Sequence, residues 1–162
     1  MFNFLKKNSN KETKLLAPIT GKTIDLSKVP DQVFAEKLAG DGVAIDPTGD
    51  VIVAPADGEL TLVFKTMHAF AITLANGAEL LIHIGIDTVS LNGEGFEQLV
   101  EAGTMVKAGT PIIKINKDFI LSKGFSLITP VLITNMDLVK ELKSNIHKDV
   151  VAGQDEVISF NV

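Results

Sequence analysis

The fold is decided by one stretch of sequence, which reads His68-Ala69-Phe70-Ala71-Ile72-Thr73-Leu74-Ala75-Asn76-Gly77-Ala78-Glu79-Leu80-Leu81-Ile82-His83-Ile84-Gly85-Ile86-Asp87. An Asn-Gly pair between two apolar, β-branched runs predicts a hairpin, because a type I′ turn needs positive φ at both central residues. With a two-residue loop, His83 faces Phe70 across the hairpin. His68 lies two residues further along the same strand, at a diagonal position roughly 7–8 Å from His83 at the backbone. The stretch therefore predicts that two imidazoles meet over one face of a β-sheet.

Histidine is the side chain best suited to exchange a proton or a phosphoryl group at neutral pH, so this pair is the candidate reactive centre. His83 lies among leucines and isoleucines, where desolvation favours the neutral imidazole with a nucleophilic nitrogen. Thr66 has the parity of His68 and either hydrogen-bonds that ring or serves only as a strand former. Asp87 follows the strand of His83 and is either a charge at the rim of the site or a turn residue. The third histidine, His147, has polar neighbours and is expected to be an exposed loop residue.

Length and composition indicate one cytoplasmic domain. The chain has 162 residues, enough for a single hydrophobic core, and it shows no secretory signal. Its hydrophobic content is 46%, but no apolar run approaches the roughly 18–20 residues that a membrane-spanning helix needs. The lack of cysteine excludes disulfides, thiolate metal sites and cysteine nucleophiles.

Charge is distributed unevenly along the chain. Residues 1–14 contain four lysines and one glutamate, whereas the whole chain has a net charge of −5 and no arginine. Residues 1–14 are therefore expected to form a flexible lysine-rich tail, which at most contacts an anionic membrane surface weakly through Phe2, Phe4 and Leu5. The acidic remainder, residues 15–162, has no basic stripe for nucleic acid and favours a basic protein partner.

Short apolar runs separated by Gly, Pro, Asn and Asp predict an all-β fold, because many closely spaced strands with turn signals are typical of sandwiches and barrels. The expected strands are 15–18, 21–25, 42–47, 50–54, 58–63, 69–74, 80–86, 111–115, 126–133 and 157–160. Short helical turns are expected at 31–38, 96–102 and 117–123, each with a glycine shortly after it.

Two short repeats predict that the fold has two related halves. Ala17-Pro18-Ile19-Thr20-Gly21 recurs as Ala54-Pro55-Ala56-Asp57-Gly58, and Val106-Lys107-Ala108-Gly109 recurs as Val150-Val151-Ala152-Gly153. Each copy leads into an apolar strand. The expected architecture is thus an antiparallel β-sandwich or barrel-sandwich of two related halves with short helical turns.

The stretch from Gly77 to Val89 resembles the active-site signature of the glucose-class enzyme IIA proteins of the bacterial phosphoenolpyruvate-dependent sugar phosphotransferase system. The resemblance extends to residues 29–37, 40–45, 68–70, 91–96 and 129–131. It implies an antiparallel β-sandwich, an IIA phosphocarrier domain over residues 15–162, and no cofactor.

The resemblance also implies roles for the site residues. His83 would accept a phosphoryl group from the histidine phosphocarrier protein and pass it to a cysteine on the IIB domain of a sugar permease. His68 would bind phosphate oxygens, with Thr66 orienting it, and Asp31 and Asp87 match acids at the rim of the site. The residues that match the apolar docking surface are otherwise ordinary core candidates: Val33, Phe34, Leu38, Phe64 and Leu81. Because family members bind other proteins through this face, regulated transporters or kinases are further candidate partners.

The sequence leaves two other functions open. The run His83-Ile84-Gly85-Ile86-Asp87 resembles half of the ligand set of lysostaphin-type zinc endopeptidases, although their His-x-His element is missing. A non-catalytic module, either a lipoyl- or biotinyl-type carrier or a regulatory binder, is the second. The phosphocarrier function requires no metal, but adventitious zinc at His68 and His83 is a candidate. The sugar, the oligomeric state, and whether the chain is free-standing or a domain of a larger permease stay undetermined.

Overall fold

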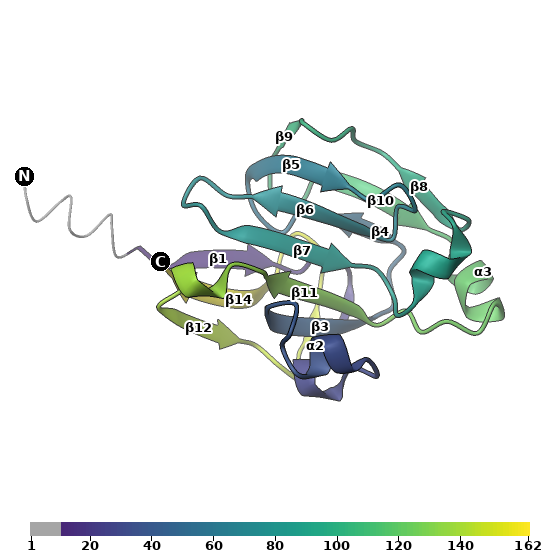
Figure 1. Ribbon diagram of the computed structural model, residues 1–162, viewed down its shortest axis with the longest axis horizontal. Coiled ribbons are helices and arrows are strands. Elements are labelled where there is room, and N and C mark those ends of the chain that lie inside the picture. The colour runs from purple at the N-terminus through teal and green to yellow at the C-terminus, as the bar shows by residue number, and fades with distance from the viewer. Residues whose placement is uncertain (1–10) are drawn as a thin grey trace, which may run out of the picture.

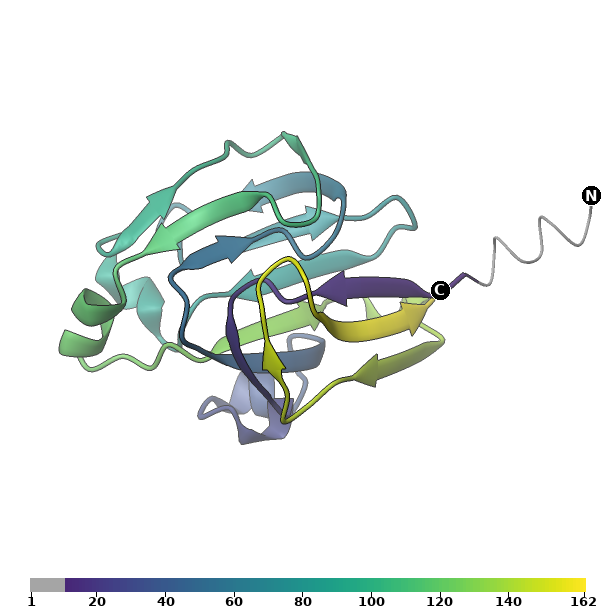
Figure 2. The ribbon, with the colours of Figure 1, turned by 180° about the vertical axis from the view of Figure 1, so that it is seen from behind.

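Residues 11–162, which the computed structural model describes, form two layers of antiparallel β-sheet (Figure 1). One layer is an eight-stranded sheet, and two three-stranded sheets form the other layer, as the reverse view shows (Figure 2). The eight strands lie in the order β13 (Asp149–Val150), β2 (Gly21–Ile24), β3 (Asp41–Pro47), β11 (Thr129–Ile133), β7 (Glu79–His83), β6 (Ala69–Thr73), β5 (Gly58–Val63) and β9 (Met105–Val106). The smaller sheets have the orders β1 (Thr13–Leu16), β14 (Glu156–Asn161), β12 (Glu141–Ser144) and β4 (Val51–Val53), β10 (Pro111–Ile115), β8 (Phe96–Gln98). The predicted all-β antiparallel sandwich is confirmed, and the sheets do not close into a barrel.

The helical segments are short and lie in the connections. Helices α2 (Gln32–Ala35) and α3 (Lys117–Ser122) confirm the helical turns expected near residues 31–38 and 117–123. Asp31 caps α2, because its side chain accepts a hydrogen bond from the backbone N–H of Val33 at 2.9 Å. The 3₁₀ segments are η1 (Leu26–Lys28), η2 (Thr88–Leu91) and η3 (Met136–Leu138).

The helical turn expected at 96–102 is wrong, because Phe96–Gln98 is strand β8. Phe96 is buried opposite Ile115 of β10, whereas Glu97 and Gln98 are exposed. Pairing with β10 therefore overrides the weak helical pattern of this segment. The expected strands also omit the short strands β9, β12 and β13.

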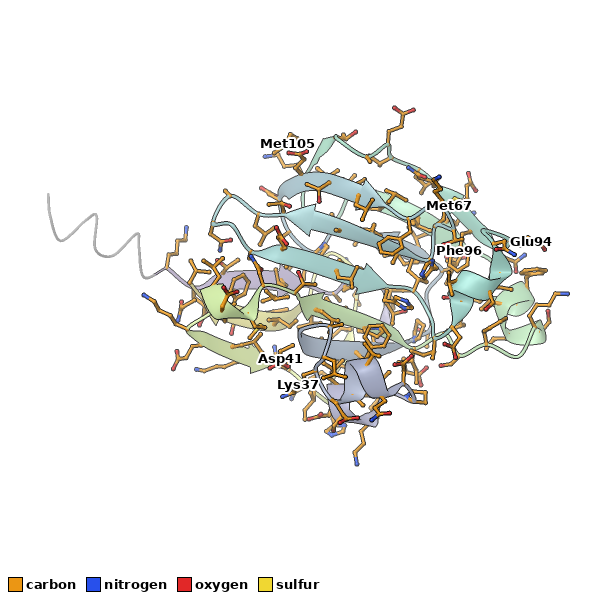
Figure 3. All side chains as sticks on the ribbon, viewed as in Figure 1. Lys37, Asp41, Met67, Glu94, Phe96 and Met105 are labelled. Atoms are coloured by element: carbon orange, nitrogen blue, oxygen red, sulfur yellow. The ribbon has the colours of Figure 1, made fainter. Side chains whose placement is uncertain are left out.

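Buried apolar side chains form two clusters. The larger one fills the space between the layers and includes Phe70 and Ile82. The smaller one lies under α2 and consists of Leu26, Val29, Phe34, Ala44, Ile86 and Leu132. Because Ala44 belongs to β3 and Leu132 to β11, this cluster holds α2 against the outer face of the eight-stranded sheet. The ion pair of Lys37 with Asp41, with Nζ and Oδ2 3.6 Å apart, adds a link from the segment after α2 to β3 (Figure 3).

The two predicted repeats occupy equivalent places in the fold. The backbone N–H of Gly153 donates to the carbonyl of Ala17 at 2.9 Å, and that of Gly109 donates to the carbonyl of Ala54 at 2.8 Å. Strand β13 pairs with the start of β2, and β9 pairs in the same way with the start of β5. The prediction of two related halves is therefore confirmed by matching hydrogen bonds.

The hairpin forms where expected, but its predicted register is wrong by one residue. Leu74 donates to the carbonyl of Ala78 at 2.9 Å, so the loop has three residues and Gly77 takes a φ of 91°. A three-residue loop that ends in a left-handed glycine is the next commonest hairpin connection after the two-residue type. His83 consequently pairs with Ala69, and Phe70 pairs with Ile82 and belongs to the core.

The boundary of the lysine-rich segment also differs from the expectation. Thr13 and Lys14 are the first residues of β1 and pair with Phe160 and Ser159, so they belong to the folded domain. Residues 1–10, with the expected tail and its membrane contact, lie outside the described residues. Within residues 11–162, no helix has both the length and the apolar character that a membrane span requires.

Candidate active site

His83 is the last residue of β7, and a backbone carbonyl fixes its imidazole. Its Nδ1 lies 2.8 Å from the carbonyl oxygen of Gly85. Since a carbonyl only accepts, Nδ1 carries the hydrogen, and Nε2 of a neutral ring keeps its lone pair. His83 as a whole residue is half-buried.

Gly85 is required for this arrangement. Its φ of 78° is a conformation that side chains rarely adopt. A Cβ at this position would lie 2.6 Å from Cγ2 of Thr88 and 2.8 Å from the carbonyl oxygen of Ser126. Thr88 also donates its hydroxyl to the carbonyl of Ile84, which ties η2 to the end of β7. The local backbone therefore turns the Gly85 carbonyl back towards the His83 ring and holds it there.

His68 lies in the turn that precedes β6. The residue before it, Met67, has a φ of 57°, and the chain enters β6 only at Ala69. The carbonyl of His68 accepts from the backbone N–H of Ile84 at 2.6 Å, which joins the His68 and His83 segments. The Oγ1 of Thr66 lies 2.6 Å from Nδ1 of His68, as the sequence suggested for this threonine.

Four aromatic rings form a row across the site. The ring centroids of Phe64 and His68 are 5.3 Å apart, those of His68 and His83 are 5.0 Å apart, and those of His83 and Phe34 are 4.8 Å apart. The two imidazoles meet edge to face, with an interplanar angle of 82°. The predicted meeting of the two histidines is confirmed, although the register that suggested it is wrong.

The Nε2 atoms of both histidines are unpaired within residues 11–162 and are not completely buried. Each Nδ1 has a partner, and no hydrogen bond to either Nε2 is found within residues 11–162. Across this part of the chain, Asn161 Oδ1 is the one buried side-chain N or O atom without a partner, so neither Nε2 is sealed off. Each Nε2 therefore keeps some exposed surface, although His68 as a whole is only 4% exposed.

Both imidazoles are held in the neutral form. Burial, and after it the charge of His83, lowers the pKa of His68 to about 4. Burial also lowers the pKa of His83, against the opposing effects of the Gly85 hydrogen bond and the carboxylates of Asp31 and Asp87. At neutral pH the Nε2 of His83 is therefore an unprotonated nucleophile.

Apolar side chains surround the rings as an exposed collar. Leu38 is 70% exposed and Val33 47% exposed, Phe64 is exposed, and Leu81 is half-buried. Phe34 differs from the expectation, because it is only 6% exposed and packs in the cluster under α2. It supports the His83 ring from below and offers little surface to a partner.

One exposed apolar residue beside the site was missed in the sequence. Val89, in η2 next to the exposed Asp87, is 49% exposed. It lies inside the Gly77–Val89 stretch, so the available signal was its position two residues after Asp87. Of the other predicted residues, Asp31 caps α2 and Thr66 contacts His68, while His147 is an exposed residue, as expected.

Metal coordination has limited support from the donor set. In the described part of the chain, no three His, Cys, Asp or Glu side chains gather as a metal-binding group. His68 and His83 alone offer two nitrogens, whereas a catalytic zinc site uses three protein ligands. The zinc hydrolase alternative therefore lacks a third ligand within residues 11–162, and zinc bridging of the two histidines stays a prediction.

Comparison with known proteins identifies the family. The sequence matches the family described as "phosphoenolpyruvate-dependent sugar phosphotransferase system, EIIA 1" over residues 13–139. It is 45% identical over 158 residues to the glucose-specific EIIA component of this system from Bacillus anthracis. The aligned region covers 98% of this chain and 95% of that protein. It is 46% identical over 147 residues to the N-acetylglucosamine-specific EIICBA component from Klebsiella pneumoniae. That aligned region covers 91% of this chain and 23% of the larger protein.

The fold is similar to that of the glucose permease IIA from Mycoplasma capricolum. The TM-score is 0.86 at 39% sequence identity, and the match covers 93% of this chain and 96% of that one. Sequence and fold thus confirm the resemblance that the Gly77–Val89 stretch suggested. The chain belongs to the EIIA 1 family of the phosphoenolpyruvate-dependent sugar phosphotransferase system, and it is a phosphotransferase component of sugar uptake.

Proposed function

We propose that His83 is the phosphoacceptor of this chain. Its Nε2 takes a phosphoryl group from the phosphohistidine of the histidine phosphocarrier protein and passes it to a cysteine on the IIB domain of a sugar permease. The observation that carries this proposal is the pair of rings 5.0 Å apart, each with its Nδ1 engaged and its Nε2 free. The EIIA family, whose relatives include a fused EIICBA protein, supports these partners.

The chemistry follows from the state of the two rings. The lone pair of His83 Nε2 forms the new N–P bond as the N–P bond of the donor histidine breaks. On transfer out, the cysteine thiolate forms an S–P bond and His83 returns to the neutral imidazole. Because phosphoryl transfer mainly needs alignment and stabilisation of the equatorial oxygens, a hydrogen-bond donor beside His83 is the main requirement.

His68 supplies that donor in one tautomer. If the Thr66 hydroxyl donates to Nδ1 of His68, the hydrogen of the neutral ring lies on Nε2, where it faces a phosphoryl group on His83. The lowered pKa keeps His68 neutral, so it contributes one directed hydrogen bond without a full positive charge. A neutral donor holds the phosphoryl group without trapping it, which suits a carrier that must release it.

The collar around the rings is the proposed docking surface. Apolar side chains in and just after α2, just after β5, in β7 and in η2 exclude water from a labile phosphohistidine while a partner is bound. The carboxylates of Asp31 and Asp87 would pair with a basic rim on the partner. The residues assigned to this surface are Val33, Leu38, Phe64, Leu81 and Val89, with Phe34 as their support. Regulated transporters or kinases that bind this face are a further proposal.

Glucose is the proposed sugar of the transport system. Relatives that match this chain nearly end to end are named glucose-specific EIIA components. The N-acetylglucosamine-specific relative shows that a similar EIIA sequence also occurs with another sugar. Transfer rates to the IIB domains of a glucose permease and of an N-acetylglucosamine permease would decide between the two sugars.

Phosphorylation with a labelled donor tests the proposal. The chain is incubated with radiolabelled phosphoenolpyruvate, enzyme I and the phosphocarrier protein, and the acid and base stability of the label is measured. We expect an acid-labile, base-stable label that is lost in His83→Ala. The matched control is His147→Ala, because His147 is exposed and outside the site. A label that persists in His83→Ala refutes the assignment.

A further inference from the structure

The chain contains two Asn-Gly pairs, Asn76-Gly77 and Asn92-Gly93, which the fold treats in opposite ways. In an Asn-Gly pair the glycine nitrogen is unhindered by a Cβ, so it can attack the asparagine side-chain amide and form a cyclic imide. The reaction needs a free amide side chain and a peptide unit that can rotate. Hydrogen bonds at either position oppose it.

Asn76 is held at every one of these points. Its Nδ2 donates to Oγ1 of Thr13 at 3.1 Å, and its Oδ1 accepts from the backbone N–H of Ala78 at 3.0 Å. The nitrogen of Gly77, which would be the nucleophile, donates to the carbonyl of Leu74 at 3.0 Å. Cyclisation at Asn76 therefore requires several hydrogen bonds to break together.

Within residues 11–162, Asn92 has none of these restraints. It is exposed at the end of η2, and no side-chain hydrogen bond of Asn92 is found in the described part of the chain. Neither the Asn92 carbonyl nor the Gly93 N–H takes part in a backbone hydrogen bond there. Asn92 has φ 52° and ψ 36°, so the peptide must rotate to bring the nitrogen to the side chain. That rotation breaks no hydrogen bond of this peptide unit.

We propose that Asn92 is a site of spontaneous deamidation, and that Asn76 is protected from it. The Gly93 nitrogen forms a bond to Cγ of Asn92 with loss of its proton, and ammonia leaves to give a succinimide. Water then opens the ring at either carbonyl, which yields aspartate or isoaspartate at position 92. The reaction is a hydrolysis overall and needs no oxidant or cofactor.

The aspartate or isoaspartate formed at position 92 lies next to the segment that carries His68. A Cβ at Gly93 would be 3.2 Å from Cε of Met67 and 3.9 Å from the carbonyl oxygen of Thr66, so the Asn92 loop packs on this turn. Figure 3 shows Met67 on the same side of the molecule as Glu94, which follows in the loop. Isoaspartate inserts a methylene group into the backbone at this contact, and both products add a negative charge. Deamidation therefore shifts the support of Thr66 and His68.

Peptide mapping of aged protein tests the proposal. The intact chain is kept folded at mildly alkaline pH, and the amide-to-acid conversion at each Asn-Gly pair is followed by mass spectrometry. We expect Asn92 to convert at least about tenfold faster than Asn76, a lower bound when the reactive conformer must first break three ordinary hydrogen bonds. Equal rates, or faster conversion at Asn76, overturn the proposal.

Two variants sharpen the test. Asn92→Gln should abolish conversion at position 92, since the longer side chain would have to close a larger ring. Thr13→Ala releases Nδ2 of Asn76 and should raise the rate there severalfold, with no change at Asn92. An unchanged rate at Asn76 contradicts the protective role of its hydrogen bonds.

The effect on the site is measured separately and rests on the proposed function. Aged wild-type protein should pass phosphate to a IIB domain more slowly than fresh protein, and aged Asn92→Gln should not. Equal activity of fresh and aged wild type removes this consequence. Because the mass measurement needs no partner, failure of the phosphocarrier proposal would leave the deamidation result intact.

Discussion

Replacing Gly85 with alanine tests how the backbone orients the His83 imidazole, the proposed phosphoacceptor. Gly85 has a φ of 78°, and its carbonyl accepts the hydrogen bond from His83 Nδ1. An added Cβ meets Cγ2 of Thr88 at 2.6 Å and the Ser126 carbonyl at 2.8 Å. The second contact is with backbone, so the segment itself must shift. We expect that shift to move the carbonyl off His83.

The magnitude follows from two separable costs. A side chain in the left-handed region costs about 1–2 kcal/mol, and overpacking of a filled site adds about 1–3 kcal/mol. Gly85→Ala should therefore lower the free energy of unfolding by about 2–5 kcal/mol. The matched control is Gly124→Ala, because Gly124 has a φ of 88° but a Cβ there would have no neighbour within 4 Å. The control should lose only the backbone part, about 1–2 kcal/mol.

Urea denaturation measures the loss of unfolding free energy in Gly85→Ala and in Gly124→Ala. Nitrogen NMR of the imidazoles measures which ring nitrogen of His83 carries the hydrogen. In the wild type, the hydrogen of neutral His83 should reside on Nδ1; in Gly85→Ala it should redistribute between the two nitrogens, and phosphoryl acceptance should slow. Gly124→Ala should keep the wild-type tautomer and acceptance rate. The reasoning is refuted if the two variants lose equal stability, or if Gly85→Ala keeps the Nδ1–H tautomer at full activity.

Four further perturbations have defined outcomes. Folding lowers the pKa of His68 from 6.5 to about 4 and also lowers the pKa of His83, so the unfolded chain binds more protons as the pH falls from 6.5 towards 4. The free energy of unfolding, measured by urea titration, should therefore decrease as the pH is lowered through this range. The decrease should be less steep in His68→Gln. Phe34→Ala should cost about 3–5 kcal/mol, because the buried ring supports His83. Val33→Ala, on the exposed side of α2, should change stability by less than about 0.5 kcal/mol and weaken binding of the phosphocarrier in calorimetry. His68→Gln should still accept phosphate but pass it on slowly in rapid-quench assays, and wild-type transfer rates would contradict its proposed role.

The sequence predicted the fold class well because turn chemistry and repeats are local signals. Glycine at 77 fixes a hairpin whichever loop length forms, and the paired Ala-Pro and Ala-Gly motifs mark equivalent positions of two halves. These signals did not predict the length of the hairpin loop, since an Asn-Gly pair suits both two-residue and three-residue loops. The segment at 96–102 failed for another reason: only the distant Ile115 reveals that Phe96 is in a strand.

The sequence indicated which side chains lie together at the candidate site better than it indicated their geometry. The sequence pattern identifies apolar residues, but it does not show which of them another element of the fold will bury. Val33 and Phe34 are adjacent on α2, yet one is 47% exposed and the other 6%, because only Phe34 points into the cluster with Leu132. The carbonyl of Gly85 had no signal as a hydrogen-bond acceptor, because its direction depends on a backbone turn stabilised by the Ser126 segment.

The imidazoles of His68 and His83 meet because regular β-structure ends beside them. In the observed register His83 lies opposite Ala69, so a continuous pleat would place residues 68 and 83 on opposite faces of the sheet. Positive φ angles of 57° at Met67, 78° at Gly85 and 60° at Asp87 interrupt the pleat on both sides. Two of these residues are not glycine, and each carries a backbone cost on the order of 1 kcal/mol or more. These backbone conformations turn His68 towards His83 and direct the Gly85 carbonyl towards Nδ1 of His83. The packed core between the layers stabilises them against their conformational cost.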